Sequence, residues 1–323
     1  MTSKNSGLVI RGSRNVFTVK SDGEGGAELE CRIKGKVLKE ARGCYNPLAP
    51  GDRVVFEPDA AYDETGRSRR TGLILGLEER RNLLTRFNQK GQSPQLLAAN
   101  VDIVLCVTTP ASPPFRPRFL DRALVQGEIA DIPTAIICNK YDLSEDDPDV
   151  EERLEDFSRI GYTVLRVSAK TGEGMDHFRK LVRNRVSALL GQSGVGKSSL
   201  VNALVPGRNI RVGAINEKYD RGNHTTTMAF LEAIPGLGDG GTYIIDTPGI
   251  RRFVPHGITG EELINYMREF APLAGTCTYG HSCSHVTEPG CKIMEAVSAG
   301  VIHEDRYESF LRIRSELLEP SGE

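Results

Sequence analysis

A glycine-rich stretch in the second half of the chain has the residue types and spacing of a phosphate-binding loop. It reads Gly191-Gln-Ser-Gly-Val-Gly-Lys-Ser198 and fits the pattern G-x-x-x-x-G-K-[ST]. Glycines let the backbone turn tightly, so several N–H groups can point at the phosphate oxygens of one ligand. The sequence therefore predicts a nucleoside triphosphate site that uses Gly191, Ser193, Gly194, Val195, Gly196, Lys197, Ser198 and Ser199.

The flanks of this loop fit the same chemistry. An apolar run at 186–190 precedes it, and a stretch with helical periodicity follows Ser199, so the loop should join a strand to a helix. The free N–H groups and positive dipole end of such a helix favour bound phosphate. Lys197 can place its charge near the β- and γ-phosphates, and the Ser198 hydroxyl can coordinate Mg²⁺.

Two further motifs can recognise the base of the nucleotide, and each follows an apolar, strand-like run. The first is Asn139-Lys-Tyr-Asp142 and the second is Ser168-Ala-Lys170. The Asp142 carboxylate can accept from both N1 and the 2-amino group of guanine, whereas adenine offers no such pair of donors. Asn139 can meet the N7/O6 edge and Lys140 can cover the ring. The backbone of Ser168, Ala169 and Lys170 can donate to O6, so the predicted ligand is GTP or GDP.

A fourth motif, Asp246-Thr-Pro-Gly249, follows a short apolar run at 243–245. Asp246 can reach the coordination shell of Mg²⁺, and the N–H of Gly249 can donate to a γ-phosphate. The polar stretch at 213–227 before it reads as a loop. Together the four motifs indicate a GTP-binding site rather than that of an ATP-dependent metabolic or repair enzyme.

A cluster of metal-ligating residue types lies near the C-terminus. Residues 277–291 contain Cys277, His281, Cys283, His285 and Cys291. Three thiolates and one imidazole suit tetrahedral Zn²⁺ in a closed structural site, and either histidine could complete the set. Such a site leaves no coordination position for water, so the cluster argues against a zinc-dependent hydrolase.

The elements that carry these motifs suggest a multidomain chain. Short strand-like runs at 7–10, 16–19, 27–33, 52–56 and 72–77 fit a small barrel of the oligonucleotide-binding (OB) type. Residues 1–85 hold 15 Lys/Arg against 12 Asp/Glu, and several basic residues cluster there. Such clusters suit phosphate contacts to RNA, and the alternative is an ordinary solvated strand face. The clustered residues are Arg32, Lys34, Lys36, Lys39, Arg42, Arg67, Arg69 and Arg70.

The middle of the chain predicts an α/β domain. Residues 82–100 read as a polar connector, after which strand-like and helical stretches alternate. The predicted strands are 101–108, 134–138, 163–167, 186–190, 228–234 and 243–245, and the predicted helices are 119–129, 150–159 and 175–183. Such alternation indicates a parallel sheet covered on both faces, with ligands at the carboxyl ends of its strands.

The C-terminal part predicts a mostly helical domain around the Cys/His cluster, with helices at 261–270 and 302–318. Residues 277–323 hold 4 Lys/Arg against 8 Asp/Glu, so this domain should dock through shape or onto protein. The predicted divisions are residues 1–82 for the barrel, 83–254 for the GTP-binding domain and 255–323 for the zinc domain.

Whole-chain properties exclude several classes of protein. The net charge is −2 over 323 residues, and no run approaches the 18 apolar residues of a membrane span. The amino-terminal stretch lacks the apolar core of a signal peptide. Seven cysteines form no disulfide framework. We therefore expect a cytoplasmic protein without a membrane partner.

The order of the motifs resembles one family. In most guanine-nucleotide switches the phosphate loop and D-x-x-G precede N-K-x-D and S-A-K, whereas here 139–142 and 168–170 come first. This rotated order is a circular permutation. With the barrel and the Cys/His cluster, it resembles the small ribosomal subunit biogenesis GTPase family RsgA (YjeQ). Further matching stretches are Asn46-Pro, Gly51-Asp-Arg-Val54, Ala98-Ala-Asn-Val-Asp102, Pro113-Pro-Phe115 and Asp121-Arg122.

The resemblance implies a function. It implies a GTP phosphohydrolase that binds the small (30S) ribosomal subunit and its 16S rRNA, acts as a monomer, and couples hydrolysis to late subunit maturation and its own release. The subunit would stimulate hydrolysis. The alternative is an RNA-binding assembly scaffold that holds GTP as a structural ligand, without stimulated turnover.

The resemblance also assigns individual residues. Many switch GTPases place a glutamine directly after D-x-x-G, but this chain has Ile250, which cannot orient water. The family instead suggests His224 as the catalytic residue and, for Mg²⁺, Thr226 beside Ser198, with Thr225 and Thr227 as alternatives. The family zinc pattern is Cys-x4-Cys-x-His-x5-Cys. The first gap here is one residue longer and contains His281, which is therefore the alternative ligand. Because Cys283, His285 and Cys291 keep the family spacing, the resemblance favours Cys277, Cys283, His285 and Cys291.

The rotated order also predicts a mechanical link. The chain leaves the sheet after Gly249 and runs directly into the zinc domain. GTP binding and hydrolysis are therefore expected to reposition that domain through a short tether.

Overall fold

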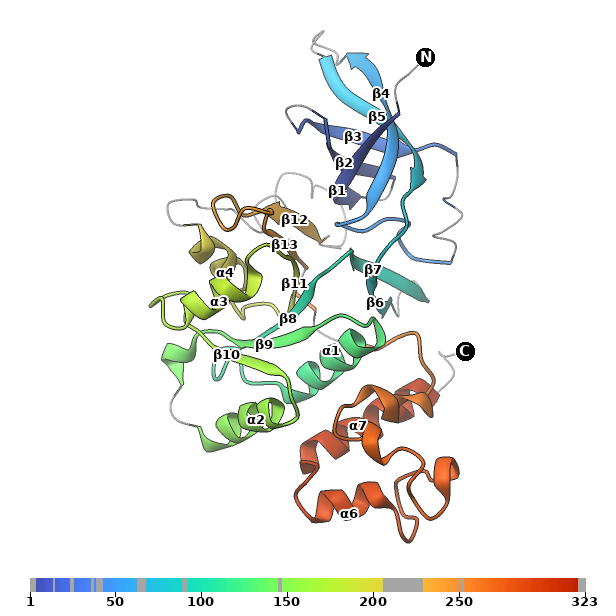
Figure 1. Ribbon diagram of the computed structural model, residues 1–323, viewed down its shortest axis with the longest axis vertical. Helices are drawn as coiled ribbons and strands as arrows, with labels where there is room; N and C mark the ends of the chain where they lie inside the picture. The colour runs from blue at the N-terminus through green and yellow to red at the C-terminus, as the bar shows by residue number, and fades with distance from the viewer. Residues whose placement is uncertain are drawn as a thin grey trace.

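The structure is a computed structural model, and it describes residues 4–13, 15–23, 26–35, 38, 43–62, 68–88, 92–144, 147–205, 229–247, 249–250 and 253–318. Along its long axis lie a β-barrel, an α/β domain and a helical domain (Figure 1). The multidomain architecture expected from the sequence is confirmed.

The barrel contains five strands: β1 (Asn5–Ser13), β2 (Val16–Ser21), β3 (Glu28–Ile33), β4 (Arg53–Tyr62) and β5 (Ser68–Leu77). Their order is β1-β2-β3-β5-β4, and pairing of β4 with β1 closes the barrel. Alternate residues point inward, so Phe17 and Val19 of β2 are buried in one core with Phe56 and Ile74. The OB-type barrel is therefore confirmed.

The predicted polar connector at 82–100 is wrong. This stretch forms an antiparallel hairpin of β6 (Leu83–Asn88) and β7 (Ser93–Ala99). Leu84 and Leu97 are buried in the core of the α/β domain, while a cross-strand hydrogen bond joins Arg86 Nε to Gln95 Oε1 at 3.0 Å. Polar residues such as Arg86 and Gln95 interrupt the apolar pattern, so the sequence alone does not reveal these two strands.

Five strands of the α/β domain form the predicted parallel sheet, in the order β10-β9-β8-β11-β13. β8, β9 and β11 are buried almost throughout, as continuous apolar runs predict. β12 (Phe230–Ala233) pairs antiparallel with β13. The parallel strands are β8 (Ile103–Thr108), β9 (Thr134–Cys138), β10 (Thr163–Arg166), β11 (Val186–Gly191) and β13 (Tyr243–Asp246).

Helices cover both faces of this sheet. Leu124 of α1 (Pro117–Ile129) and Phe157 of α2 (Pro148–Arg159) pack on one face. Phe178 of α3 (Met175–Val182) and Leu200 of α4 (Lys197–Leu204) pack on the other. A short 3₁₀ helix, Tyr141–Leu143, follows β9.

A single strand pair joins the barrel to the α/β domain. Arg11 of β1 lies opposite Phe230 of β12, so the strands of both domains form one continuous sheet of 11 strands. The pairing could not be expected from the sequence, because its two members are 219 positions apart. It sets the barrel directly beside the strand that pairs with β13.

The C-terminal domain contains two α-helices, α6 (Lys292–Ser298) and α7 (Glu304–Leu318). The second agrees with the prediction at 302–318. The predicted α-helix at 261–270 is wrong, since a 3₁₀ helix occupies Glu262–Tyr266 and the described chain continues with another at Ala271–Leu273. A third 3₁₀ helix is Gly280–Ser282. In Figure 1, α7 lies below α1.

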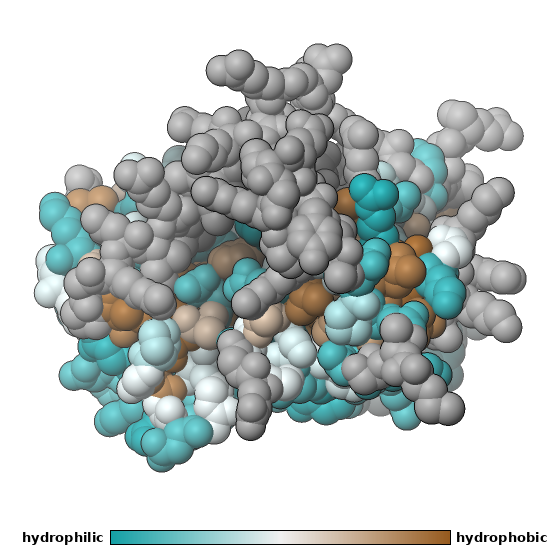
Figure 2. All heavy atoms as spheres, turned by 90° about the horizontal axis from the view of Figure 1, so that it is seen from above, coloured by the Kyte–Doolittle hydropathy of each residue, from teal (hydrophilic) through white to brown (hydrophobic). Residues whose placement is uncertain are grey.

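The described surface is of mixed polarity. Seen from above, hydrophilic residues alternate with small hydrophobic patches (Figure 2). Within the described ranges, no helix has both the length and the apolar character needed to cross a membrane.

Candidate nucleotide and metal sites

The phosphate loop lies between β11 and α4, as its sequence predicts. Lys197 is only 8% exposed, and its Nζ donates to the carbonyl oxygens of Gly191 at 2.9 Å and Gln192 at 3.2 Å. Burial lowers the pKa of Lys197, and the nearby Asp246 carboxylate opposes that shift. The ammonium group is thus held at the loop by backbone carbonyls, where an arriving phosphate could replace them.

Asn139 joins the base-recognition motif to the phosphate loop. Its side chain is 1% exposed, and Nδ2 donates to the carbonyl of Val195 at 2.9 Å. Its Oδ1 accepts from the backbone N–H of Ala169 at 3.1 Å. Gly196 has φ +86°, and a Cβ there would lie 2.4 Å from Asn139 Nδ2. Only glycine permits both this backbone conformation and this close approach.

The other base-motif residues lie around Asn139. The Ser168 hydroxyl donates to Asp142 Oδ1 at 2.6 Å, which fixes that carboxylate. Lys140 is in the left-handed region at φ 58°, and its Nζ donates to the carbonyl of Ser112 at 2.8 Å. Lys170 follows in the same loop. The structure therefore brings residues 139–142, 168–170 and 191–199 into one site at the carboxyl ends of β9, β10 and β11.

Asp246 ends β13 beside the phosphate loop. Burial raises its pKa to about 6, although the Lys197 charge opposes the shift. Its Oδ1 is buried and has no hydrogen-bond partner among the described residues. A buried oxygen without a hydrogen-bond partner costs free energy, so the Asp246 carboxylate is suited to bind a cation or a water molecule held by that cation. This donor suits Mg²⁺, which prefers oxygen ligands.

Gly249 touches the phosphate loop directly. A Cβ on Gly249 would lie 2.8 Å from the backbone nitrogen of Ser193, so a side chain there would force the two loops apart. The next residue, Ile250, donates its N–H to the carbonyl of Gly191 at 3.2 Å. His224, Thr225, Thr226 and Thr227 lie outside the described residues, so their predicted roles stay predictions.

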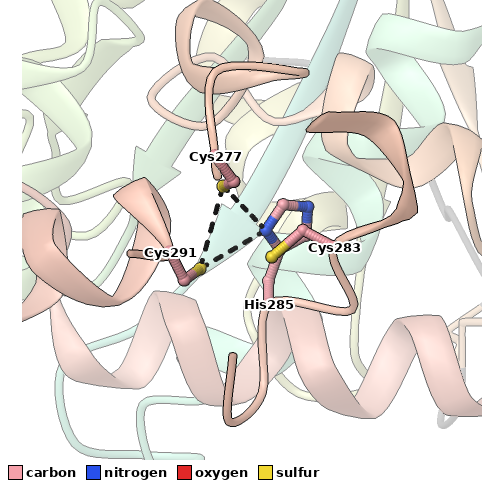
Figure 3. Close-up of side chains that lie close together, drawn as sticks. All are labelled: Cys277, Cys283, His285 and Cys291. Atoms are coloured by element: carbon pink, nitrogen blue, oxygen red, sulfur yellow. Dashed lines mark hydrogen bonds between the residues drawn. The ribbon is translucent and has the colours of Figure 1, made fainter. Parts of the chain in front are cut away.

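Four side chains form the Cys/His cluster in the C-terminal domain. The ligand atoms of Cys277, Cys283, His285 and Cys291 all lie within 4.8 Å of one another and are buried (Figure 3). His285 Nδ1 lies 3.6 Å from Cys277 Sγ and 3.5 Å from Cys291 Sγ. Tetrahedral Zn²⁺ with bonds of about 2.3 Å separates its ligands by about 3.8 Å. The cluster therefore fits zinc.

The second histidine of the cluster does not join this group. His281 lies against Gly275, where its ring is 2.7 Å from the position of an added Cβ. His285 is held in place from α7, because the Tyr307 hydroxyl donates to its carbonyl at 2.7 Å. Lys292 N–H also donates to Cys277 Sγ at 3.3 Å, which favours a thiolate there.

Sequence reasoning missed a buried charge cluster between α1 and α7. Arg306 is 1% exposed and donates to Asp121 Oδ1 at 2.8 Å and to Glu269 Oε1 at 2.6 Å. Burial alone would lower the pKa of Arg306, but the two carboxylates outweigh it and raise the pKa above its ordinary value. The Asp121-Arg122 stretch was a signal, since Arg122 also binds Glu316 of α7 at 2.7 Å.

Comparisons with known proteins agree with this geometry. The model of the RsgA GTPase family matches residues 77–255. The chain is 40% identical over 319 residues to the small ribosomal subunit biogenesis GTPase RsgA of Chlorobaculum tepidum, covering 97% of this chain and 98% of that one. It is 37% identical over 319 residues to the RsgA of Thermotoga maritima, covering 98% of both.

Solved structures have the same architecture. The crystal structure of YjeQ from Thermotoga maritima superimposes with a TM-score of 0.69 at 33% identity, covering 98% of this chain and 100% of that one. YloQ, described as a circularly permuted GTPase, gives a TM-score of 0.64 at 25% identity, covering 98% and 95%. The permuted order of motifs is therefore confirmed, and the protein is an enzyme that hydrolyses GTP. The chain belongs to the RsgA GTPase family.

Proposed function

We propose that this GTPase binds the small ribosomal subunit and its 16S rRNA, and that the subunit stimulates hydrolysis. Hydrolysis would then accompany late maturation of the subunit and release of the protein. The observation that carries the GTP-binding part of the proposal is the position of Asn139, which hydrogen-bonds both to Val195 of the phosphate loop and to Ala169 of the base loop. The relatives named above, which the chain matches over nearly its full length, carry the subunit in their names.

We assign the nucleotide contacts as follows. Asp142 and Asn139 bind guanine, Lys140 covers the ring, and residues 168–170 donate to O6. Lys197 and the backbone of the phosphate loop bind the β- and γ-phosphates, and Gly249 N–H donates to the γ-phosphate. Ser198, Thr226 and Asp246 hold Mg²⁺ directly or through its water. The ion would neutralise charge that develops on the phosphates.

His224 is our candidate for orienting the attacking water, because Ile250 at the position after Gly249 is apolar and 2% exposed. It can do so by accepting a proton or hydrogen bond from water at one ring nitrogen. In this assignment, His224 alone among the residues of the chain orients the attacking water.

The three parts of the chain have separate tasks in this proposal. The barrel (1–82) supplies RNA contacts through basic residues such as Arg32 and Lys34. The domain at 83–254 controls when the protein is bound to the subunit, through GTP binding and hydrolysis. The zinc domain (255–323) sets docking geometry, with Cys277, Cys283, His285 and Cys291 holding one Zn²⁺. We propose that the protein works in the cytoplasm as a monomer.

The experiment is GTP hydrolysis with and without isolated small subunits, for the wild type and His224→Ala. We expect slow basal turnover, strong stimulation by the subunit, and a loss of about 10²–10⁴-fold in the stimulated rate of the variant. His177→Ala is the matched control, because His177 is exposed on α3. No stimulation in the wild type would favour the scaffold function. Stimulation that survives in His224→Ala would assign water orientation to another group.

A further inference from the structure

The side chain of Gln126 in α1 holds the chain shortly after the Asp246–Gly249 motif. Gln126 is 1% exposed, and Oε1 accepts from the backbone N–H of His256 at 2.8 Å. Its Nε2 donates to the carbonyl of the same residue at 3.4 Å. Both polar ends of one buried amide thus bind one residue of the main chain. The pair of contacts fixes the direction of the chain at His256 as well as its position.

A second element holds the same segment from its other side. We call residues 253–256 the exit segment, because they lead from the nucleotide site to the C-terminal domain. The backbone N–H of Phe87 in β6 donates to the carbonyl of Val254 at 3.2 Å, and the rings of Phe87 and His256 stack with centroids 5.9 Å apart. Phe253 is buried and packs edge-to-face on Phe119 of α1. The exit segment is therefore clamped between α1 and β6.

The motif just before the exit segment is anchored to the phosphate loop. Ile250 N–H donates to the carbonyl of Gly191 at 3.2 Å, and Gly249 lies against Ser193. Gly249 and His256 are seven positions apart in the sequence. A short chain fixed at both ends has fewer conformations than one fixed at a single end. Ordering the Gly249 N–H for a ligand therefore costs less entropy while the Gln126 contacts are in place.

We propose that Gln126 is a positioning residue for recognition of the γ-phosphate. It touches neither nucleotide nor Mg²⁺, and acts by holding the exit segment so that Gly249 N–H stays aimed at the γ-phosphate position. The inference rests on the role of Gly249 in the proposed function. Because GDP has no γ-phosphate, loss of the Gln126 contacts lowers affinity for GTP and leaves affinity for GDP unchanged.

The test compares Gln126→Met with a matched clamp elsewhere in the chain. Asn82 holds Val101 in the same way, with Oδ1 accepting from its N–H at 2.9 Å and Nδ2 donating to its carbonyl at 2.8 Å. Asn82→Leu therefore removes an equivalent pair of contacts away from the exit segment. Dissociation constants are measured for GDP and for a non-hydrolysable GTP analogue, together with kcat and KM for GTP.

Two hydrogen bonds of ordinary strength correspond to about tenfold in affinity. We expect Gln126→Met to weaken binding of the GTP analogue by about tenfold and to change the dissociation constant of GDP less than twofold. In GTP hydrolysis, the variant should raise KM more than it lowers kcat. Asn82→Leu should leave the ratio of the two affinities unchanged. The proposal is overturned if Gln126→Met weakens binding of GDP and of the GTP analogue equally, or if it leaves the ratio of the two affinities unchanged.

Gly249→Ala separates this inference from the function on which it rests. If Gly249→Ala leaves the preference for the GTP analogue unchanged, the γ-phosphate contact itself is wrong. If Gly249→Ala reduces that preference and Gln126→Met does not, only the positioning role is wrong. Should Gln126→Met fail to fold, Phe87→Leu loosens the exit segment from β6 and must give the same selective loss for the GTP analogue.

Discussion

At the scale of single residues, hydrogen bonds within the protein orient the Asp142 carboxylate. The Ser168 hydroxyl donates to one carboxylate oxygen at 2.6 Å, and the same hydroxyl accepts from Thr171 N–H at 3.1 Å. The carboxylate therefore pays little entropy when it meets a base. Guanine selectivity then depends on matching two N–H donors of the ligand to two acceptor oxygens.

Replacing Asp142 by Asn should change which base is bound. An amide offers one acceptor and one donor, so it mismatches the 2-amino group of guanine and suits the 2-carbonyl of xanthine. We expect GDP to bind at least about 10²-fold more weakly to Asp142→Asn, and XDP to bind more tightly. Competition binding with both nucleotides measures this. Asp149→Asn, at an exposed position of α2, is the control and should keep the guanine preference.

Glu288 supports the loop that carries the proposed zinc ligands without being one of them. Its carboxylate accepts from the N–H groups of Ser284 at 2.8 Å, Val286 at 3.1 Å and Thr287 at 3.1 Å. The hydrogen bond with the Ser284 side chain contributes most, followed by that from the Ser284 N–H, and together they lower the pKa of Glu288 to about 2. The carboxylate thus shapes the loop on both sides of His285.

Removing the negative charge of Glu288 should weaken zinc binding. We expect Glu288→Gln to weaken zinc binding by about 10- to 100-fold, as loss of groups that orient ligands does elsewhere. Competition with a chromogenic chelator measures the affinity. Glu295→Gln, which breaks only the exposed pair with Lys292, is the control. Equal zinc retention in both variants would show that Glu288 does not support the site.

At the scale of elements, the length and continuity of an apolar run decided what could be predicted. β8, β9 and β11 are buried on both faces, so their sequences are almost wholly apolar, with Thr108, Thr134 and Ser187 as the polar exceptions, and identify them directly. The β6–β7 hairpin mixes half-buried polar residues with a fully buried end at 96–99, and a register shift lies between Leu84 and Thr85, so neither strand shows a regular alternation. A local pattern therefore could not separate it from a connector.

The nucleotide motifs could be predicted because each is a short local sequence, such as 139–142. The contacts that position them could not. Gln126 and His256 are 130 residues apart, and nothing in a helical glutamine distinguishes a clamp from an ordinary surface side chain. The 3₁₀ helix at Glu262–Tyr266 was also missed, since its apolar spacing resembles that of an α-helix.

His256 should make the contact between the exit segment and the hairpin sensitive to pH. Burial of the ring, which stacks on Phe87 of β6, disfavours its charged form and lowers the pKa of His256 below the ordinary 6.5. The unfolded chain then takes up a proton more readily than the folded one. The free energy of unfolding should therefore be highest above about pH 6.5 and fall below it.

Urea denaturation of the wild type and His256→Gln, at about pH 7.5 and about pH 5.5, measures this effect. The variant should lose less stability on acidification than the wild type, because glutamine does not titrate. A matching variant is His177→Gln, which changes an exposed histidine of α3. The same pH dependence in wild type and His256→Gln would mean that the ring does not contribute.

At the scale of the whole molecule, buried charges hold the C-terminal domain on the α/β domain. Arg306 of α7 binds Asp121 of α1, and Ser309 of α7 donates to the same carboxylate. The pairs Arg122–Glu316 and Arg268–Glu128 add to this contact nearer its edge. Arg306 and Asp121 are 185 positions apart in the sequence, so only the folded structure shows that they are partners.

Breaking the centre of this interface should separate the two domains. Arg306→Met leaves Asp121 and Glu269 as buried carboxylates without their partner, which costs about 3–5 kcal/mol. Arg312→Met, on the same helix, removes a half-exposed pair with Glu308 and should cost at most about 1 kcal/mol. Hydrogen exchange of α7 and thermal unfolding measure both. Similar destabilisation by the two variants would contradict a central role for Arg306.

The rotated order of motifs has a consequence for how the protein is made. The ribosome completes β8, β9 and β10 before it reaches β11, yet β11 belongs between β8 and β13 in the finished sheet. Until residues 186–191 emerge, the nascent chain carries β8, which is apolar except for Thr108, with an unpaired edge. Such edges template aggregation. The helices α1, α2 and α3 are made before β11 and can cover the two faces of the incomplete sheet, but not this edge. Between synthesis of β10 and of β11, the growing polypeptide would thus need a chaperone to shield the edge of β8.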